Sequence, residues 1–84
     1  MQLILYTRAG CHLCDEAKQQ LAPLLREFGL GLHEVDVDTD AELKALFGEE
    51  LPVLFLNDRK VAKVRVDVAR LRRTLESTQR APTR

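Results

Sequence analysis

Residues 2–14 read QLILYTRAGCHLC, and the rest of the predicted architecture follows from this stretch. Its first half, Gln2 to Thr7, is short, apolar and rich in strand-forming residues, which predicts a buried strand. Ala9-Gly10 then supplies a turn. Two cysteines follow, and from Leu13 apolar residues recur every three to four positions, as on one face of a helix. The stretch predicts a strand and a turn that bring a C-x-x-C pair to the start of a helix.

This first helix is expected to end at Gly29, since glycine often follows the last helical turn. Pro23 lies inside it and removes one backbone hydrogen bond, so we expect a kink or a break there. Gly31 to Val37 alternates in the manner of a second strand. Strand, helix and strand in this order predict two parallel strands.

The middle of the chain predicts a short helix. Thr39 or Asp40 is expected to cap its start, and Gly48 is expected to end it. Its predicted apolar face consists of Leu43, Leu46 and Phe47.

The last third predicts a β-hairpin and a final helix. The apolar run Pro52–Leu56 is typical of a central strand buried on both faces. Asn57-Asp58 provides turn chemistry before a strand over Val61–Val66, and Asp67 is expected to cap the helix that follows. The predicted apolar stripe of that helix is Val68, Leu71 and Leu75.

The element order β-α-β-α-β-β-α predicts an α/β domain with a four-stranded mixed sheet and helices on both faces. A chain of 84 residues builds a single core, and we expect one domain over residues 1–77 and a flexible tail over residues 78–84. The longest apolar run, Leu51 to Leu56, is far shorter than the ~20 residues that span a bilayer, and the start of the chain lacks the pattern of a secretory signal. We therefore expect a cytoplasmic protein without membrane association.

The chemistry of residue 11 follows from its predicted place at a helix start. Free N–H groups and the positive end of the helix dipole favour a thiolate there, which lowers the pKa of Cys11 from about 8.5 toward about 3.5–7.5. Arg8 and His12 add cations that lower it further. Cys14 lies nearly one helical turn deeper on the same side, close enough to form a disulfide. These positions predict thiol–disulfide exchange with Cys11 as nucleophile and Cys14 as resolving thiol, without a tightly bound cofactor.

Three other interpretations of the cysteine pair are a zinc site, a structural disulfide and two ordinary buried thiols. Zinc takes four ligands as a rule, and only His12 and His33 remain as further nitrogen donors. A disulfide that closes so short a loop stabilises the fold little. His12 either tunes the Cys11 thiolate or is an exposed residue with no task, and His33 is expected to be an ordinary surface residue.

Residues 6–14, YTRAGCHLC, resemble the active-site segment Y-[ST]-K-x-x-C-P-Y-C of the glutaredoxins, and the element order is similar to their minimal thioredoxin fold over nearly the whole chain. The resemblance places Arg8 where the family has a lysine that attends the thiolate and the glutathione carboxylate. Leu51-Pro52-Val53 is similar to the family's T-V-P segment. It implies a cis-proline at Pro52 that faces the dithiol, and a backbone at Leu51 that pairs with the substrate.

The chain departs from the family in two places. His12-Leu13 replaces the proline and tyrosine between the cysteines, and Val61–Val66 holds no counterpart of the glycine pair that lets the backbone approach glutathione. Asp67 corresponds either to the acidic residue after that pair or only to a helix cap. Both protein disulfides and glutathione therefore remain candidate substrates.

The net charge of zero conceals two opposed parts. Residues 1–58 carry four basic and eleven acidic residues, a net charge of −7, and residues 59–84 carry nine basic and two acidic residues, a net charge of +7. The basic part is expected either to bind an acidic protein or anionic ligand, or to be a solvated face paired with Asp36, Asp38 and Glu42. Nucleic-acid binding is not expected, because no aromatic residue interleaves with the basic run. The basic residues concerned are Lys63, Arg70, Arg72 and Arg73.

We thus expect a monomeric oxidoreductase that exchanges its dithiol with a protein or glutathione disulfide and is served by a thiol reductant. The alternative is a non-catalytic binding or redox-sensing module. In that form the cysteines could hold an iron–sulfur cluster, whose four ligands would require two subunits or added glutathione.

Overall fold

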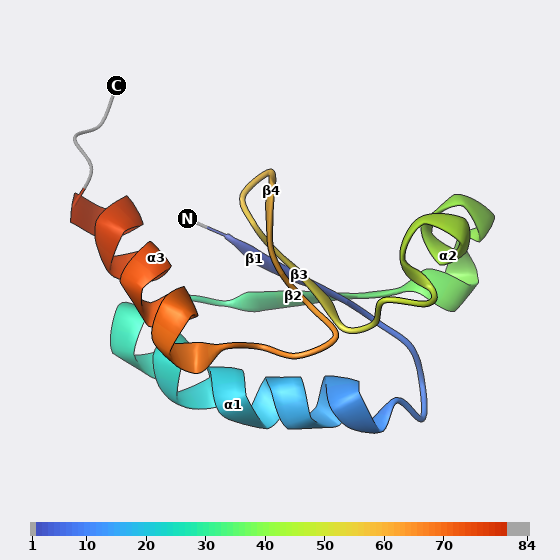
Figure 1. The fold of residues 1–84 in the computed structure, drawn as a ribbon, viewed down its shortest axis with the longest axis horizontal. Coiled ribbons are helices and arrows are strands. Elements are labelled where there is room, and N and C mark those ends of the chain that lie inside the picture. The colour runs from blue at the N-terminus through green and yellow to red at the C-terminus, as the bar shows by residue number, and fades with distance from the viewer. Residues whose placement is uncertain (1, 81–84) are drawn as a thin grey trace.

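The computed structural model describes residues 2–80 and has the predicted order of strands and helices, with one additional 3-10 turn (Figure 1). The elements are β1 (Leu3–Thr7), α1 (His12–Phe28), β2 (Leu32–Asp36), η1 (Val37–Thr39), α2 (Ala41–Phe47), β3 (Val53–Leu56), β4 (Arg59–Lys63) and α3 (Val68–Arg80).

The four strands form one mixed sheet in the order β2-β1-β3-β4. β1 runs parallel to β2 and antiparallel to β3, and β3 runs antiparallel to β4. In the register, Leu5 lies opposite Glu34 on one side and Leu54 on the other. The predicted α/β class with a mixed sheet is confirmed, and β1 is a central strand whose C-terminal end leads directly to the cysteine pair.

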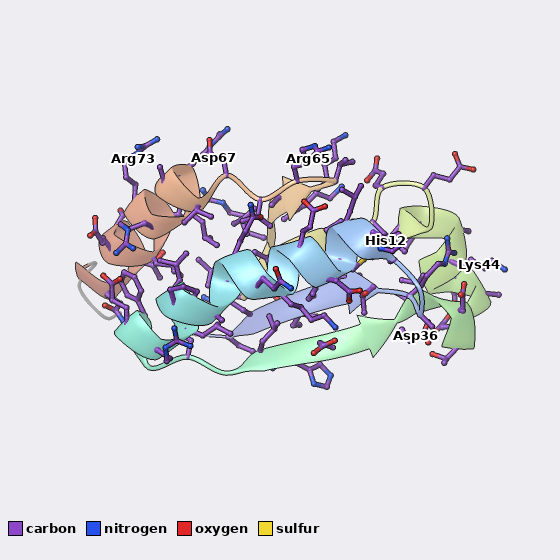
Figure 2. The ribbon with its side chains drawn as sticks, turned by 90° about the horizontal axis from the view of Figure 1, so that it is seen from below. His12, Asp36, Lys44, Arg65, Asp67 and Arg73 are labelled. Atoms are coloured by element: carbon purple, nitrogen blue, oxygen red, sulfur yellow. A yellow bond between two sulfur atoms is a disulfide. The ribbon has the colours of Figure 1, made fainter. Side chains whose placement is uncertain are left out.

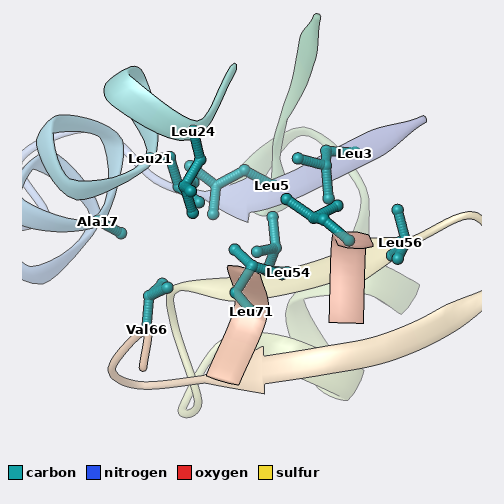
Figure 3. Packing of buried hydrophobic residues seen from close by; sticks show 10 residues of the cluster. Leu3, Leu5, Ala17, Leu21, Leu24, Leu54, Leu56, Val66 and Leu71 are labelled. Atoms are coloured by element: carbon teal, nitrogen blue, oxygen red, sulfur yellow. The ribbon is translucent and has the colours of Figure 1, made fainter. Parts of the chain in front are cut away.

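The main core lies between one face of the sheet and helices α1 and α3. Alternate residues of β1 point to this face, so Leu3 and Leu5 are fully buried while Ile4 and Tyr6 between them are only partly buried. Figure 3 shows the leucines of β1, β3 and α1 meeting those of α3. The buried members of the cluster are Leu3, Leu5, Ala17, Leu21, Leu24, Leu54, Leu56, Val66, Leu71 and Leu75.

Helix α2 packs on the opposite face, so the expectation of helices on both faces is also confirmed. The ring of Phe47 stacks on Tyr6 with centroids 4.6 Å apart, and Phe55 completes an aromatic trio. Leu46, predicted to share the apolar face of α2, is 66% exposed, and that prediction is wrong. A helix of seven residues contacts the sheet through one narrow face, and the i, i+4 pair Leu43 and Phe47 occupies it.

The helix ends follow the sequence closely. Asp40 caps α2 by accepting hydrogen bonds from the N–H groups of Glu42 and Leu43, and Gly29 ends α1 in the left-handed conformation at φ 64°. Helix α1 is continuous through Pro23, so no break occurs there. None of the helices within residues 2–80 is long and apolar enough to cross a membrane.

Two predicted boundaries differ from the structure. Strand β4 begins at Arg59 and ends at Lys63, because a two-residue turn with Asn57 at φ 55° starts the pairing at once and Val64 leaves the sheet. Helix α3 extends past Ser77 to Arg80, and the Thr78 hydroxyl donates to the Thr74 carbonyl while the side-chain amide of Gln79 donates to Phe28 O at the end of α1. Residues 81–84 of the predicted tail lie outside the described residues.

Candidate functional site

The two cysteines lie at the junction of β1 and α1, as predicted. Gly10 turns the chain at φ 77°, a left-handed conformation that glycine adopts without a steric cost. Cys11 is the N-cap of α1, and its Sγ accepts a hydrogen bond of 3.2 Å from the N–H of Cys14. Cys11 and Cys14 form a disulfide with their Cα atoms 5.2 Å apart. The Cys11 sulfur thus occupies the place where a capping side chain normally satisfies a free N–H group.

The two sulfur-bearing residues differ in exposure. Cys14 is 1% exposed and packs in a second apolar cluster with Val37 and Leu51, whereas Cys11 is only partly buried at the edge of the same cluster. Tyr6, Leu43 and Phe47 pack against this cluster. A molecule approaching from solvent therefore reaches Cys11, and the protein encloses Cys14.

Leu51 and Pro52 are brought to the cysteine pair from the other half of the chain. The Leu51–Pro52 peptide bond is cis, and both residues are buried. The carbonyls on either side of Leu51 are occupied, since the N–H of Val64 donates to Glu50 O at 3.0 Å and to Pro52 O at 2.8 Å. The N–H and C=O of Leu51 itself make no hydrogen bond within residues 2–80. One peptide segment beside the disulfide thus keeps a free donor and a free acceptor.

Val64, which no sequence pattern singled out, holds this loop in place. Its φ of 65° lies in the left-handed region, which is uncommon for a β-branched residue, and the N–H of Arg65 bonds back to Lys63 O at 2.6 Å. A left-handed residue spanned by an i, i+2 bond is the rarer, strained form of the γ-turn. Valine favours strands, and the sequence therefore predicted a strand here. The turn depends on hydrogen bonds to the loop around Pro52, which no local pattern indicates.

Arg8 is directed to a neighbouring loop. Its guanidinium donates to both carboxylate oxygens of Asp38, at 3.2 and 3.0 Å, and to the carbonyl of Gly48 at 3.3 Å. This hydrogen-bonded pair raises the pKa of Arg8 and lowers the pKa of Asp38. Arg8 was predicted to attend the Cys11 thiolate. In the structure, it ties the segment before the cysteines to η1 and to the end of α2.

The remaining predicted site residues lie farther out. His12 is exposed at the first position of α1, and His33 is exposed on β2. Asp67 caps α3, its Oδ1 accepting a hydrogen bond from the N–H of Arg70 at 3.1 Å, and Figure 2 shows it well away from His12. The structure therefore gathers Cys11, Cys14, Leu51 and Pro52 in one place and leaves Asp67 outside it. Among residues 2–80, no group of three or more His, Cys, Asp or Glu residues could hold a metal ion.

The ion pairs of the basic part differ from those expected. Asp38 pairs with Arg8, and Arg72 of α3 pairs with Glu27 of α1. Lys60 and Lys63 both pair with Glu50, at 3.3 and 3.6 Å. The prediction that the basic face pairs with Asp36, Asp38 and Glu42 is wrong. These residues lie at the end of β2, in η1 and in α2, and Figure 1 shows α2 at the opposite end of the molecule from α3.

Glu50 is expected to contribute to acid sensitivity. Its hydrogen bond from Lys60, together with the charges of Lys60 and Lys63, holds its pKa below the ordinary value of 4.5. Because the pKa is depressed in the folded state, the stabilisation is complete above 4.5 and is lost as the pH falls through the folded-state value. Glu50→Gln should therefore flatten the acid side of a plot of unfolding free energy against pH. Urea titrations over a series of pH values measure the unfolding free energy. Glu49→Gln, at an exposed neighbouring residue, is the control and should keep the wild-type dependence of that free energy on pH.

Residues 2–76 match the family model described as Glutaredoxin-like domain (DUF836). The chain belongs to this family. Uncharacterized protein Rv0508 of Mycobacterium tuberculosis is 42% identical to this glutaredoxin-like chain over 76 residues, which cover 84% of the chain and 78% of the relative.

Several solved structures are similar to this glutaredoxin-like protein. The X-ray structure of target protein XcR50 from X. campestris is 36% identical, with a TM-score of 0.73 and coverage of 95% of this chain and 99% of that one. The solution structure of glutaredoxin from Brucella melitensis is 27% identical, with a TM-score of 0.66 and coverage of 94% and 86%. The thioredoxin-like fold expected from the sequence is therefore confirmed.

Proposed function

We propose that this glutaredoxin-like protein is a thiol–disulfide oxidoreductase that exchanges its Cys11–Cys14 pair with a protein or glutathione disulfide. The proposal rests on the unequal solvent exposure of the two cysteines. A partly exposed sulfur lies at a helix N-terminus and is bonded to a sulfur that is almost fully buried. An exchange reaction needs this division between an accessible nucleophile and a second thiol that is kept from solvent.

In the reductive direction, the Cys11 thiolate attacks one sulfur of the substrate disulfide. A Cys11–substrate disulfide forms, the substrate S–S bond breaks, and the other substrate sulfur leaves as a thiolate that takes up a proton. The N–H of Cys14 already donates to Cys11 Sγ, and the helix N-terminus favours negative charge at that atom. Arg8 and His12 lie on either side of Cys11 in the chain, but the guanidinium of Arg8 is paired with Asp38, so the helix N-terminus is the group that acts on the thiolate directly.

Cys14 then completes the exchange. Its thiol gives up a proton and its sulfur attacks Cys11 Sγ, which breaks the mixed disulfide and releases the second substrate thiolate, which is then protonated. The substrate gains two electrons from the two cysteine sulfurs and two protons, one released by Cys14 and one from solvent, where Cys11 left its own proton when it formed the thiolate. A thiol reductant, glutathione or a protein, restores the dithiol.

The backbone of Leu51 is the proposed binding site for an extended substrate segment. Its N–H and C=O have no partner within residues 2–80 and lie beside the cysteines, while Val64 occupies the carbonyls of Glu50 and Pro52. A substrate strand that pairs with Leu51 would be held by main-chain bonds, which do not depend on substrate sequence. The proposal includes a monomer that acts in the cytoplasm, where thiols are kept reduced.

The order in which the two thiols react tests this proposal. In the reduced protein, the helix N-terminus should place the pKa of Cys11 below the ordinary ~8.5 of a cysteine, and burial should protect Cys14. Brief iodoacetamide treatment across a pH series, read by mass spectrometry of peptides, should label Cys11 first and already below that pH. Equal labelling of both residues, or labelling of Cys11 only in strongly alkaline buffer, would contradict the assignment.

A further inference from the structure

A cavity lined by three arginines lies apart from the cysteine site. It has a volume of about 340 Å³ and is formed by the start of β4 and the exposed side of α3. Arg59 comes from the strand, and Arg70 and Arg73 come from the helix. Figure 2 shows Arg73 at the opposite end of the molecule from His12, which follows Cys11. The hydroxyl residues Thr74, Ser77 and Thr78 complete the lining.

The three guanidinium groups have no ion-pair partner within residues 2–80, although other basic side chains nearby do. Arg72 pairs with Glu27, and Lys60 pairs with Glu50. Arg70 and Arg73 lie one helical turn apart, where like charges destabilise a helix. The fold thus gathers three basic side chains at the cavity that make no ion pair within residues 2–80.

The hydrogen-bonding groups of the lining favour a ligand that accepts hydrogen bonds. The hydroxyls of Thr74 and Thr78 already donate to the carbonyls of Arg70 and Thr74, at 3.1 and 2.8 Å. The free donors are therefore the guanidinium groups and the hydroxyl of Ser77, which makes no hydrogen bond within residues 2–80. Guanidinium groups bind phosphoryl oxygens through paired hydrogen bonds. Three of them carry a charge of +3, which a single carboxylate of −1 would not balance, so a phosphoryl group is the better match.

A second cavity of about 570 Å³ shares Arg59, Thr74 and Thr78 with the first. Its other walls mix apolar Leu56 and Val61 with polar residues of the hairpin turn, Asn57 and Asp58. Asp58 would repel an anion, so the anionic group belongs in the arginine cavity and an uncharged body belongs beside the turn. Both hollows are shallow and open to solvent, so a ligand would be held by its contacts with the arginines rather than by enclosure.

We propose that the two cavities form a binding site for a small organic phosphate. The phosphoryl group lies among Arg59, Arg70 and Arg73 and accepts a hydrogen bond from Ser77. The uncharged part of the ligand lies against Leu56 and Val61. None of these residues belongs to the cluster around the cysteines, so the oxidised and reduced proteins bind this ligand equally well.

Titrations of the full chain followed by amide NMR shifts test this site, with AMP, pyrophosphate and adenosine as probes. AMP should shift the amides of Thr74, Ser77 and Arg59, and adenosine should not. Arg59→Gln and Arg73→Gln should each weaken AMP binding about tenfold, the range of one charge-assisted hydrogen bond. Arg26→Gln, which removes an exposed charge on α1, is the matched control and should leave binding unchanged.

Each contrary result has a definite meaning. The absence of shifts with AMP, or equal weakening in Arg26→Gln and Arg73→Gln, would overturn the site. Binding of pyrophosphate as tight as that of AMP would overturn the organic ligand in favour of an inorganic oxyanion. The site is tested separately from the redox function, because AMP should bind equally well to Cys11→Ser, in which thiol exchange is removed.

Discussion

Cys11→Ser is expected to abolish disulfide reduction, leaving only the uncatalysed rate of the buffer. A serine hydroxyl remains protonated at neutral pH and does not form the mixed disulfide, so both steps of the exchange are lost. Cys14→Ser should have a different effect. It leaves the accessible nucleophile in place and removes only the buried sulfur that resolves the intermediate, so a Cys11–substrate disulfide should accumulate.

Reduction of a small aromatic disulfide, followed by absorbance, measures the first expectation, and intact-protein mass spectrometry detects the trapped adduct of the second. Ala45→Ser, on the exposed side of α2, controls for the introduction of a serine and should retain full activity. Full activity in Cys11→Ser would disprove the assignment of the nucleophile. A Cys14→Ser protein that reacts but yields no adduct would disprove the assignment of the resolving thiol.

Leu54→Ala is expected to lower the free energy of unfolding by about 3 kcal/mol, within the range of ~2–5 kcal/mol for such substitutions in a core. Leu54 is 0% exposed and lies on central strand β3, opposite Leu5, in the cluster that joins the sheet to α1 and α3. Truncation removes apolar surface that is fully buried and leaves a cavity that this closely packed cluster can fill only in part.

Leu46→Ala is the matched control, because the same atoms are removed from a leucine that is 66% exposed. Its unfolding free energy should remain within about 0.5 kcal/mol of wild type. Urea unfolding followed by circular dichroism measures both variants under the same conditions. Equal losses in the two proteins would show that α2 buries Leu46 in solution and would contradict the packing described for this face.

The junction between β1 and α1 could be predicted because everything that forms it is local. A short apolar run, a glycine turn and a helical stripe lie within about twenty consecutive residues, and Cys11 is the cap itself. The caps at Asp40 and Asp67 and the left-handed Gly29 were predictable for the same reason. Each is determined by hydrogen bonds between residues at most a few positions apart.

The sequence predictions that were wrong concern residues whose environment depends on distant parts of the chain. Leu46 has the spacing of a buried residue, but only the position of α2 over Tyr6 decides which of its leucines is covered. Val64 is a residue type that favours strands, but its N–H donates to the carbonyls of Glu50 and Pro52, and the residue adopts a turn conformation instead. Asp38 was assigned to the basic helix, and the parallel pairing of β1 with β2 brings it to Arg8 instead.

Local patterns along the chain were enough to predict the order of elements and the two thiols at a helix start, because helix periodicity, capping and cysteine spacing act over short distances. The way the thiols are presented depends on the packing of the sheet and helices. This packing encloses Cys14, leaves Cys11 accessible, and places the unpaired backbone of Leu51 beside them. It likewise gathers Arg59 with Arg70 and Arg73 in one cavity. Exposure and convergence depend on how the sheet and helices pack, and packing is a property of contacts between residues far apart in the sequence.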